Sequence, residues 1–260
     1  MMNRLSIALA VLLCLTQAAT MKAQQKQPKK KQPPKITMIL PLGAISGTKE
    51  KFTIRGLGLD KTTEVEFVNS EVKVKLLQKG KAQVRDKNPQ QAGDTQVVVE
   101  LDIPKSIEGP VLDFVVITPE GKSQTHRLLL PGSLPMVKEK EKNEGFQTAQ
   151  KVSVPQIVRG RIDNQRDVDV YSFDGKAGER IQIEVFGQRH GSVMDSMITL
   201  FDGNGQQVAF NDDGDDKTTD SKILAILPKT GMYHISLIEA NDRGGATYPY
   251  WLVVQLAKQK

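Results

Sequence analysis

Cysteine is almost absent from this sequence: Cys14 is the only one among 260 residues. It lies in the apolar run near the start of the chain, so removal of that run leaves no thiol. A chain without thiols forms no disulfides, has no cysteine nucleophile and builds no zinc site on thiolates. Its stability must therefore come from hydrophobic cores or from a bound ion.

Long hydrophobic runs are also missing, because no segment approaches the ~20 apolar residues of a membrane-spanning helix. The longest run, Leu5–Leu15, follows Arg4 and is followed by small residues with candidate cleavage points between Ala19 and Ala23. This order is typical of a secretory signal. We expect residues 1–23 to be a signal peptide and the mature chain to lack a transmembrane span. The protein should be exported, to the periplasm, the cell surface or the extracellular space.

The net charge of +6 is not a property of the whole chain. Residues 24–35 are rich in lysine, proline and glutamine and are expected to form a disordered linker. From Phe146 onward, 13 basic and 15 acidic residues give a net charge of −2. The basic tail is therefore expected to be a spacer or a tether to anionic envelope polymer. The sequence predicts no nucleic-acid surface.

Catalytic motifs are the third absence. The sequence contains no His-Glu-x-x-His, no Gly-x-Ser-x-Gly and no glycine loop of the phosphate-binding type. Among three histidines, only His190 lies close to a candidate nucleophile, Ser192. We expect the protein not to be an enzyme, with a cryptic hydrolase built around His190 as a rival hypothesis.

Alternation of apolar and polar residues with a period of two is what the sequence does contain. It predicts seven short strands in the first half, a number typical of an immunoglobulin-like sandwich. These are 36–40, 52–55, 65–67, 72–77, 97–101, 111–118 and 125–130. Eight more in the second half indicate a jelly-roll-like sandwich: 157–162, 168–173, 180–186, 197–201, 208–210, 223–227, 232–238 and 250–256. The expected fold class is all-β, with two β-sandwich domains.

Within the second half, the alternation also assigns faces. In VDVYSF, Asp169, Tyr171 and Phe173 share one face. In the MYHISL segment, Tyr233 and its alternate neighbours form the core face, which leaves His234 on the outer face. Trp251 and the neighbouring tyrosines are expected to pack in the core, although a stacking platform for sugar or peptide is an alternative.

Two stretches resemble known families. PPKITMILPLGAISGTKEKFTIRGLGL, residues 33–59, and TPEGKS, residues 118–123, are similar to the opening strands and the late hairpin of IPT/TIG immunoglobulin-like domains. The motifs NEGFQTAQ, VRGRI, DVDVYSF, KAGERIQIEV, DSMITLFDGNGQQVAFNDD, GMYHISL and YPYWLVV resemble the bacterial pre-peptidase C-terminal domain. The expected domains are 36–134 (immunoglobulin-like) and 146–257 (pre-peptidase C-terminal-like), joined by a charged linker at 135–145.

The linker contains KEKEKNE, which starts at Lys138 and is compatible with three conformations. In a helix, Glu139 and Lys142 would pair at a spacing of three residues. In an extended chain, Glu139, Glu141 and Asn143 share one face. The third possibility is a connector without structure or ligand.

A resemblance favours the extended form. Collagen-binding domains of secreted clostridial collagenases, which are related to the pre-peptidase C-terminal domain, ligate calcium through a Glu-x-Glu-x-Asn-Asp stretch and aspartates before a tyrosine-containing strand. The resemblance implies a Ca²⁺ site that fixes the junction between the domains, with Arg166 at the place of one aligned aspartate and Asp167 one residue out of register. The implied ligands are Glu139, Glu141, Asn143, Glu144, Asp167 and Asp169.

A second acidic group offers an alternative metal site. The loop NDDGDDKTTD holds Asp212, Asp213, Asp215 and Asp216, and such crowding either stays in solvent or binds a cation. Its spacing does not match an EF-hand.

The sequence as a whole predicts an exported, non-catalytic binding, adhesion or scaffold protein whose ligand is an extracellular protein or polysaccharide. The alternative is an accessory module that targets a secreted protease or assists its secretion.

Overall fold

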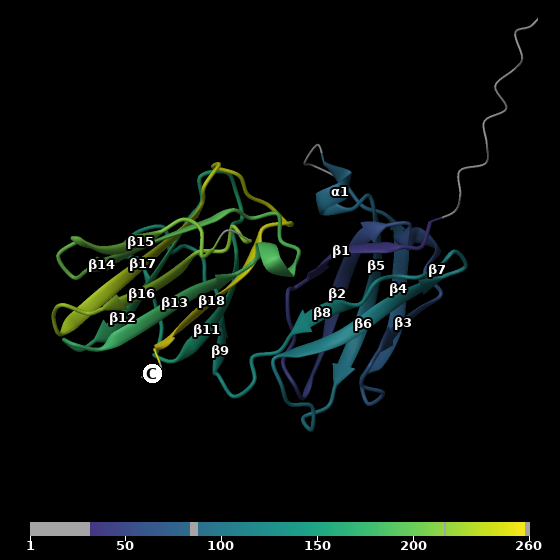
Figure 1. Ribbon diagram of the computed structural model, residues 1–260, viewed down its shortest axis with the longest axis horizontal. Helices are drawn as coiled ribbons and strands as arrows, with labels where there is room; N and C mark the ends of the chain where they lie inside the picture. Colours follow the sequence, from purple (N-terminus) through teal and green to yellow (C-terminus); the bar gives the residue numbers. More distant parts are fainter. Residues whose placement is uncertain (1–31, 84–87, 216, 258–260) are drawn as a thin grey trace, which may run out of the picture. The chain divides into compact units, whose positions relative to one another are not determined.

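The computed structural model describes residues 32–83, 88–215 and 217–257. The expected signal peptide and most of the basic tail lie outside these residues. The described chain is built almost wholly of strands (Figure 1), which confirms the predicted all-β class. Its helical elements are α1 (Pro89–Ala92), η1 (Leu59–Lys61) and η2 (Gln188–His190). Within the described ranges, no helix has both the length and the apolar character needed to cross a bilayer.

The first sandwich consists of two sheets. One has the strand order β1-β2-β5-β4, and the other has the order β3-β6-β7 with β8 also paired to β6. The strands are β1 (Lys35–Leu40), β2 (Thr48–Leu57), β3 (Glu64–Phe67), β4 (Lys73–Lys81), β5 (Thr95–Ile103), β6 (Val111–Thr118), β7 (Gly121–Lys122) and β8 (His126–Leu129). Alternation places Val97, Val99 and Leu101 of β5 fully inside the core, as expected for a half-buried strand.

The second sandwich has two five-stranded sheets, with strand orders β16-β13-β18-β11-β9 and β10-β12-β17-β14-β15. The strands are β9 (Met136–Lys138), β10 (Gln150–Lys151), β11 (Gln156–Arg161), β12 (Val168–Gly175), β13 (Arg180–Phe186), β14 (Ser196–Asp202), β15 (Gln207–Asn211), β16 (Lys222–Ile226), β17 (Gly231–Glu239) and β18 (Pro249–Leu256). The predicted faces hold: Tyr171, Phe173 and Tyr233 lie in its core.

Residues 136–151, which we call the strap, belong to this second sandwich. Strand β9 runs parallel to β11 at the edge of one sheet, and β10 runs parallel to β12 at the edge of the other. The amide of Gln150 closes the loop between them: it donates to the Lys138 carbonyl (3.0 Å) and accepts from the Lys140 N–H (2.7 Å). Lys138 is the last residue of β9 and residues 139–144 form no helix, so the helical reading of KEKEKNE is wrong.

An apolar cluster joins the two sandwiches within the compact unit formed by residues 32–260. Leu42 and Leu129 of the first sandwich pack with Ile157, Trp251 and Val253 of the second. Beside this cluster, Arg159 donates to both carboxylate oxygens of Glu50, at 3.0 and 2.8 Å. The ring of Trp251 is thus core, as predicted, and the alternative of a sugar-stacking platform is wrong for it.

Candidate metal centre

The site starts from strand β12, whose alternation directs Asp169 and Tyr171 to the interior of the second sandwich. Both side chains are fully buried, as is Tyr250 of β18. A buried carboxylate costs free energy unless it is paired, hydrogen-bonded or bound to a cation. Asp169 therefore needs partners that a solvent-facing aspartate does not.

Glu139, which follows β9, brings a second carboxylate to the same place. Its backbone N–H donates to the carbonyl of Arg159 (3.0 Å), which continues the pairing of β9 with β11. The hydroxyl of Tyr171 donates to Oε1 of Glu139 (2.7 Å), and the hydroxyl of Tyr250 lies 2.6 Å from the same oxygen. Tyr250 also lies 2.7 Å from Oδ2 of Asp169, and the two hydroxyl oxygens are 2.5 Å apart.

These contacts leave the cluster short of positive charge. Two hydroxyl hydrogens serve four close oxygen–oxygen contacts, so at least one further proton or cation is needed when both carboxyl groups are ionised. Accordingly, burial and the charge of Glu139 raise the pKa of Asp169 to about 10. Burial also raises the pKa values of Tyr171 and Tyr250 well above those of ordinary tyrosines.

Glu141 completes the acidic cluster. Glu139, Glu141 and Asp169 each offer one carboxylate oxygen, and these oxygens all lie within 4.8 Å of one another. Glu141 is exposed to solvent, yet desolvation of its carboxyl group and the charges of Glu139 and other nearby carboxylates raise its pKa to about 7. We call these three residues the acidic cluster.

Unpartnered polar atoms accompany the cluster. Asn143 is fully buried, and neither its Oδ1 nor its Nδ2 has a hydrogen-bond partner among the described residues; the same is true of Oδ1 of Asp169. The backbone carbonyl of Asn143 accepts from the N–H of Val170 (2.9 Å), which holds the strap against β12. Buried polar atoms normally find a partner in the protein or in ordered solvent. Carboxylate and amide oxygens are the ligands that Ca²⁺ prefers, so the residues present fit a hard cation.

The remaining predicted ligands lie around the acidic cluster and are not part of it. Glu144 is exposed, and Oδ2 of Asp167 accepts the N–H of Asp163 (2.6 Å). Both carboxylates contribute to the raised pKa of Glu141. Arg166 is exposed and has a positive φ of 61°. Glu144 and Asp167 therefore act on the site through their charge.

The alternative site is brought together only in part. Asp212 and Asp213 gather with Asp195, again with carboxylate oxygens within 4.8 Å of one another. Asp195 was not predicted; its Oδ2 accepts from the side chain of Asn241 (3.2 Å). Asp215 instead accepts the N–H of Lys217 (2.9 Å), and Asp216 lies outside the described residues. Both Asp212 and Asp213 are exposed, which favours the reading of a solvated turn.

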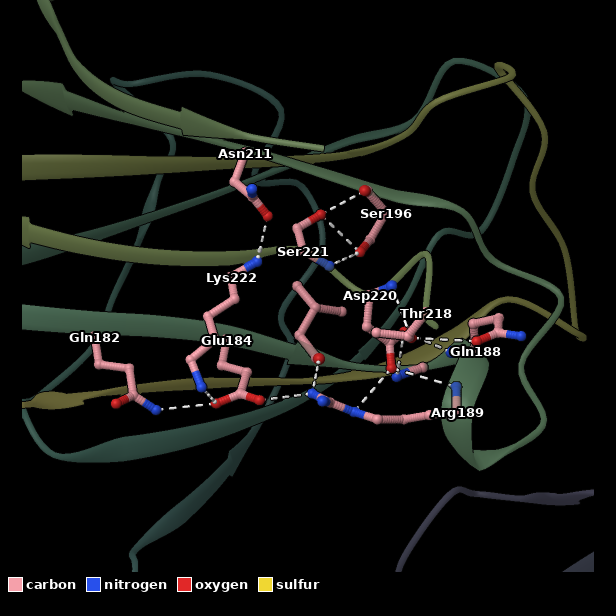
Figure 2. A network of polar contacts seen from close by, with 12 residues as sticks. Gln182, Glu184, Gln188, Arg189, Ser196, Asn211, Thr218, Asp220, Ser221 and Lys222 are labelled. Carbon is pink, nitrogen blue, oxygen red and sulfur yellow. Dashed lines mark hydrogen bonds and ion pairs between the residues drawn. The ribbon is translucent and has the colours of Figure 1, made fainter. Parts of the chain in front are cut away.

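A neighbouring buried aspartate has a structural role (Figure 2). Asp220 accepts the backbone N–H groups of Gly187 (3.0 Å) and Gln188 (2.6 Å), and Nε of Arg189 lies 3.0 Å from its Oδ2. The guanidinium of Arg189 also donates to Glu184 (2.8 Å). Both carboxylate oxygens of Asp220 are thus bound by the turn after β13, and Asp220 holds this turn in place.

The histidine–serine pair proposed for a hydrolase does not form. The hydroxyl of Ser192 bonds the carbonyl of Thr247 (3.4 Å) and the N–H of Met194 (3.2 Å), while His190 packs against Phe186 with ring centroids 5.9 Å apart. Burial lowers the pKa of His190 to about 4. No hydrogen bond joins His190 to Ser192 in the part of the chain that the structure describes.

Sequence reasoning missed three contributors to the acidic cluster and its surroundings: Tyr171, Tyr250 and Gln150. Tyr171 shares the inward face of β12 with Asp169, so the alternation contained a signal for it. Tyr250 carried no such signal, because its partners lie 81 and 111 positions away in the sequence. Gln150 carried none either, because no periodicity of one strand links it to Lys138 and Lys140.

Comparison with known proteins relates the second sandwich to one family. Residues 167–238 match the family described as the bacterial pre-peptidase C-terminal domain. Over 77 residues the chain is 40% identical to a probable subtilase-type serine protease of Deinococcus radiodurans. That match covers 29% of this chain and 10% of the protease, so the chain spans about a tenth of this relative.

Solved structures give weaker likenesses. The pre-peptidase C-terminal domain of a Bacillus anthracis collagenase is 16% identical, with a TM-score of 0.35, and the match covers 45% of this chain and all of that one. The periplasmic lysozyme inhibitor PliG of Aeromonas hydrophila is 18% identical, with a TM-score of 0.30, and covers 48% of this chain and 97% of its own.

Proposed function

We propose that the protein is an exported, non-catalytic binding or scaffold protein whose second sandwich and strap are fixed by Ca²⁺. The observation that supports this proposal is the acidic cluster beside the buried, unpartnered side chain of Asn143. Bound Ca²⁺ supplies the positive charge that two carboxylates and two tyrosine hydroxyls lack. Export is supported by the secretory signal expected in residues 1–23 and by the likeness of residues 167–238 to a domain of proteases.

In this role, the chain's own residues act in three ways. Asp169 is the fully buried charged ligand and Glu139 the half-buried one, and the hydroxyls of Tyr171 and Tyr250 hold them in place. Glu141 and Asn143 close the site from the strap. With the strap fixed, the second sandwich keeps a covered edge on each sheet and presents a rigid surface to a ligand.

The test is a calcium titration of the purified chain by calorimetry and thermal melting. We expect Ca²⁺ to bind and to raise the melting temperature, and EDTA to reverse the gain. Glu141→Gln should weaken binding at least tenfold, because one charged ligand is lost. Glu144→Gln is the matched control, since Glu144 is outside the acidic cluster and acts on it only through its charge; it should weaken binding by less than about threefold. A melting temperature unaffected by millimolar Ca²⁺, or equal effects of the two variants, would refute the calcium part.

A second candidate function is an accessory to a secreted protease, favoured by the 40% identity to a subtilase-type protease over 77 residues. An accessory module changes how the protease binds its substrate. Adding the chain to a subtilase secreted by the same organism should then change the rate of casein hydrolysis. An unchanged rate, together with retention of the chain on envelope polymer, would favour the scaffold function.

A further inference from the structure

One edge of the first sandwich is open and has an uncommon composition. Strand β4 is nine residues long and ends the sheet β1-β2-β5-β4, so it is paired on one side only, with β5. Strand β3 ends the opposite sheet, on the same side of the sandwich. Between them lies a groove of about 750 Å³. An unpaired edge strand of this length is a template for strand addition by another polypeptide.

The groove and its rim expose apolar side chains. Val68 is 80% exposed, and Leu76 and Leu77 are about 40% exposed (40% and 39%). Phe67 and Val72 form the buried floor of the same groove. Apolar side chains at an unpaired edge offer an incoming strand contacts in addition to backbone hydrogen bonds.

The charge of β4 selects among partners. Its sequence KVKLLQKGK contains four lysines, all exposed. Lys79 reaches across to the carbonyl of Thr62 (2.8 Å), whereas Lys73, Lys75 and Lys81 form no ion pair with any described residue. Two copies of β4 side by side would set these lysines against one another, and like charges directly opposite are destabilising. An acidic strand would meet them favourably.

We propose that β4 binds an extended acidic segment of a partner polypeptide by strand addition, with the partner's carboxylates facing the lysines and its apolar side chains entering the groove. Main-chain hydrogen bonds give such a complex its affinity, and side chains of alternate residues give it specificity. This docking site rests on the binding role proposed above but is independent of the calcium site, which lies in the other sandwich.

The test uses two synthetic ten-residue peptides. In the acidic peptide glutamate alternates with valine, and in the basic peptide lysine alternates with valine. We expect the acidic peptide to bind and to protect the amides of residues 73–81 from hydrogen exchange, and the basic peptide not to bind. Lys73→Glu/Lys75→Glu should weaken binding at least about tenfold, because attraction at two exposed positions becomes repulsion. Lys176→Glu/Lys217→Glu changes the net charge equally at two exposed lysines of the other sandwich and should bind within about threefold of the original chain.

Three outcomes overturn this proposal. The two double variants bind the acidic peptide equally well, or the peptide protects only another strand from hydrogen exchange, or residues 73–81 become protected without peptide as the protein concentration is raised. The last would identify a second copy of the chain as the occupant. Failure here, with calcium binding intact and retention on envelope polymer, would leave the proposed function standing. Loss of all binding to polypeptide and polymer would count against both.

Discussion

Calcium binding is expected to release protons, because the acidic cluster holds them when no cation is present. The pKa of Asp169 is about 10, so this carboxyl is protonated at pH 7. The pKa of Glu141 is about 7, so that carboxyl is about half protonated. Ca²⁺ requires ionised ligands, so binding at pH 7 should release roughly 1.5 protons per ion.

The released protons make the affinity depend on pH with a definite sign. The logarithm of the association constant should rise by about 1 to 1.5 for each pH unit near pH 7, which is a tenfold gain or more. Calorimetry in PIPES, HEPES and Tris separates the released protons from the intrinsic heat, since these buffers differ in ionisation enthalpy. Glu141→Gln should lower the number of protons released per ion by roughly half a proton, while the proton released by Asp169 should remain.

Two results would refute this reasoning. Heats that do not depend on the buffer would mean that Asp169 is already ionised in the metal-free chain. An association constant that is flat between pH 6 and pH 8 would mean that neither carboxyl loses a proton on binding. Either result would remove the argument that the tyrosine–carboxylate contacts need an added positive charge.

Four further outcomes are expected. In EDTA, the free energy of unfolding measured in urea titrations should fall as pH rises from 5.5 to 8.5, because the raised pKa values let the folded chain bind more protons than the unfolded chain. The slope is at most about 1.4 kcal/mol per pH unit for one proton. Saturating Ca²⁺ should abolish this slope. Tyr250→Phe should cost about 1–3 kcal/mol in urea unfolding, because buried carboxylate oxygens lose their donor. Asp220→Ala should cost about 2–4 kcal/mol by the same measurement, because backbone amides lose a charged acceptor. Gly43→Ala should cost about 1–3 kcal/mol and shift the fluorescence of Trp251, because a Cβ there would lie 2.1 Å from the indole ring.

Matched variants separate these effects from general damage. Tyr233→Phe removes a hydroxyl that bonds the backbone of Lys229, and should cost about 0.5–1.5 kcal/mol with no effect on calcium. Asp215→Ala and Gly80→Ala change exposed or open positions and should stay within about 0.5 kcal/mol. Equal costs for Gly43→Ala and Gly80→Ala would contradict the packing of Trp251 against the first sandwich.

Local alternation made most of the strands predictable. Strands β6 and β13 begin and end at the predicted residues, because their apolar positions recur with a strict period of two between turn residues. The same pattern placed Asp169 and Tyr171 on one face of their strand, which the structure shows to be the inward one. The immunoglobulin-like IPT/TIG resemblance of the first half stays a prediction, since its fold class is confirmed and its family is not.

Contacts between distant residues set the limit of that reasoning. Arg159 forms a hydrogen bond with Glu50, which is 109 positions earlier in the sequence, and Tyr250 forms one with Asp169, which is 81 positions earlier. No periodicity within one segment encodes such pairs. For the same reason, the alternation of KEKEKNE could place Glu139 and Glu141 on one face but could not show which buried group they would approach.

The two short strands of the strap explain why its side chains matter so much. Strand β9 aligns three residues with β11, and β10 aligns two with β12, so backbone pairing alone holds the strap weakly. Side chains add the rest: Gln150 closes the loop, and Phe146 stacks on His234 with ring centroids 4.4 Å apart. Glu139 and Glu141 of the acidic cluster lie in the loop between β9 and β10.

A cation bound at the acidic cluster would therefore stabilise the edges of both sheets at once, because each edge strand of the strap is short and the loop between them carries the ligands. Removing the cation should raise hydrogen exchange in β9 and β10 together while the amides of β13 and β18 stay protected. Independent loss of protection at only one of the two edges would show that the strap does not act as a unit.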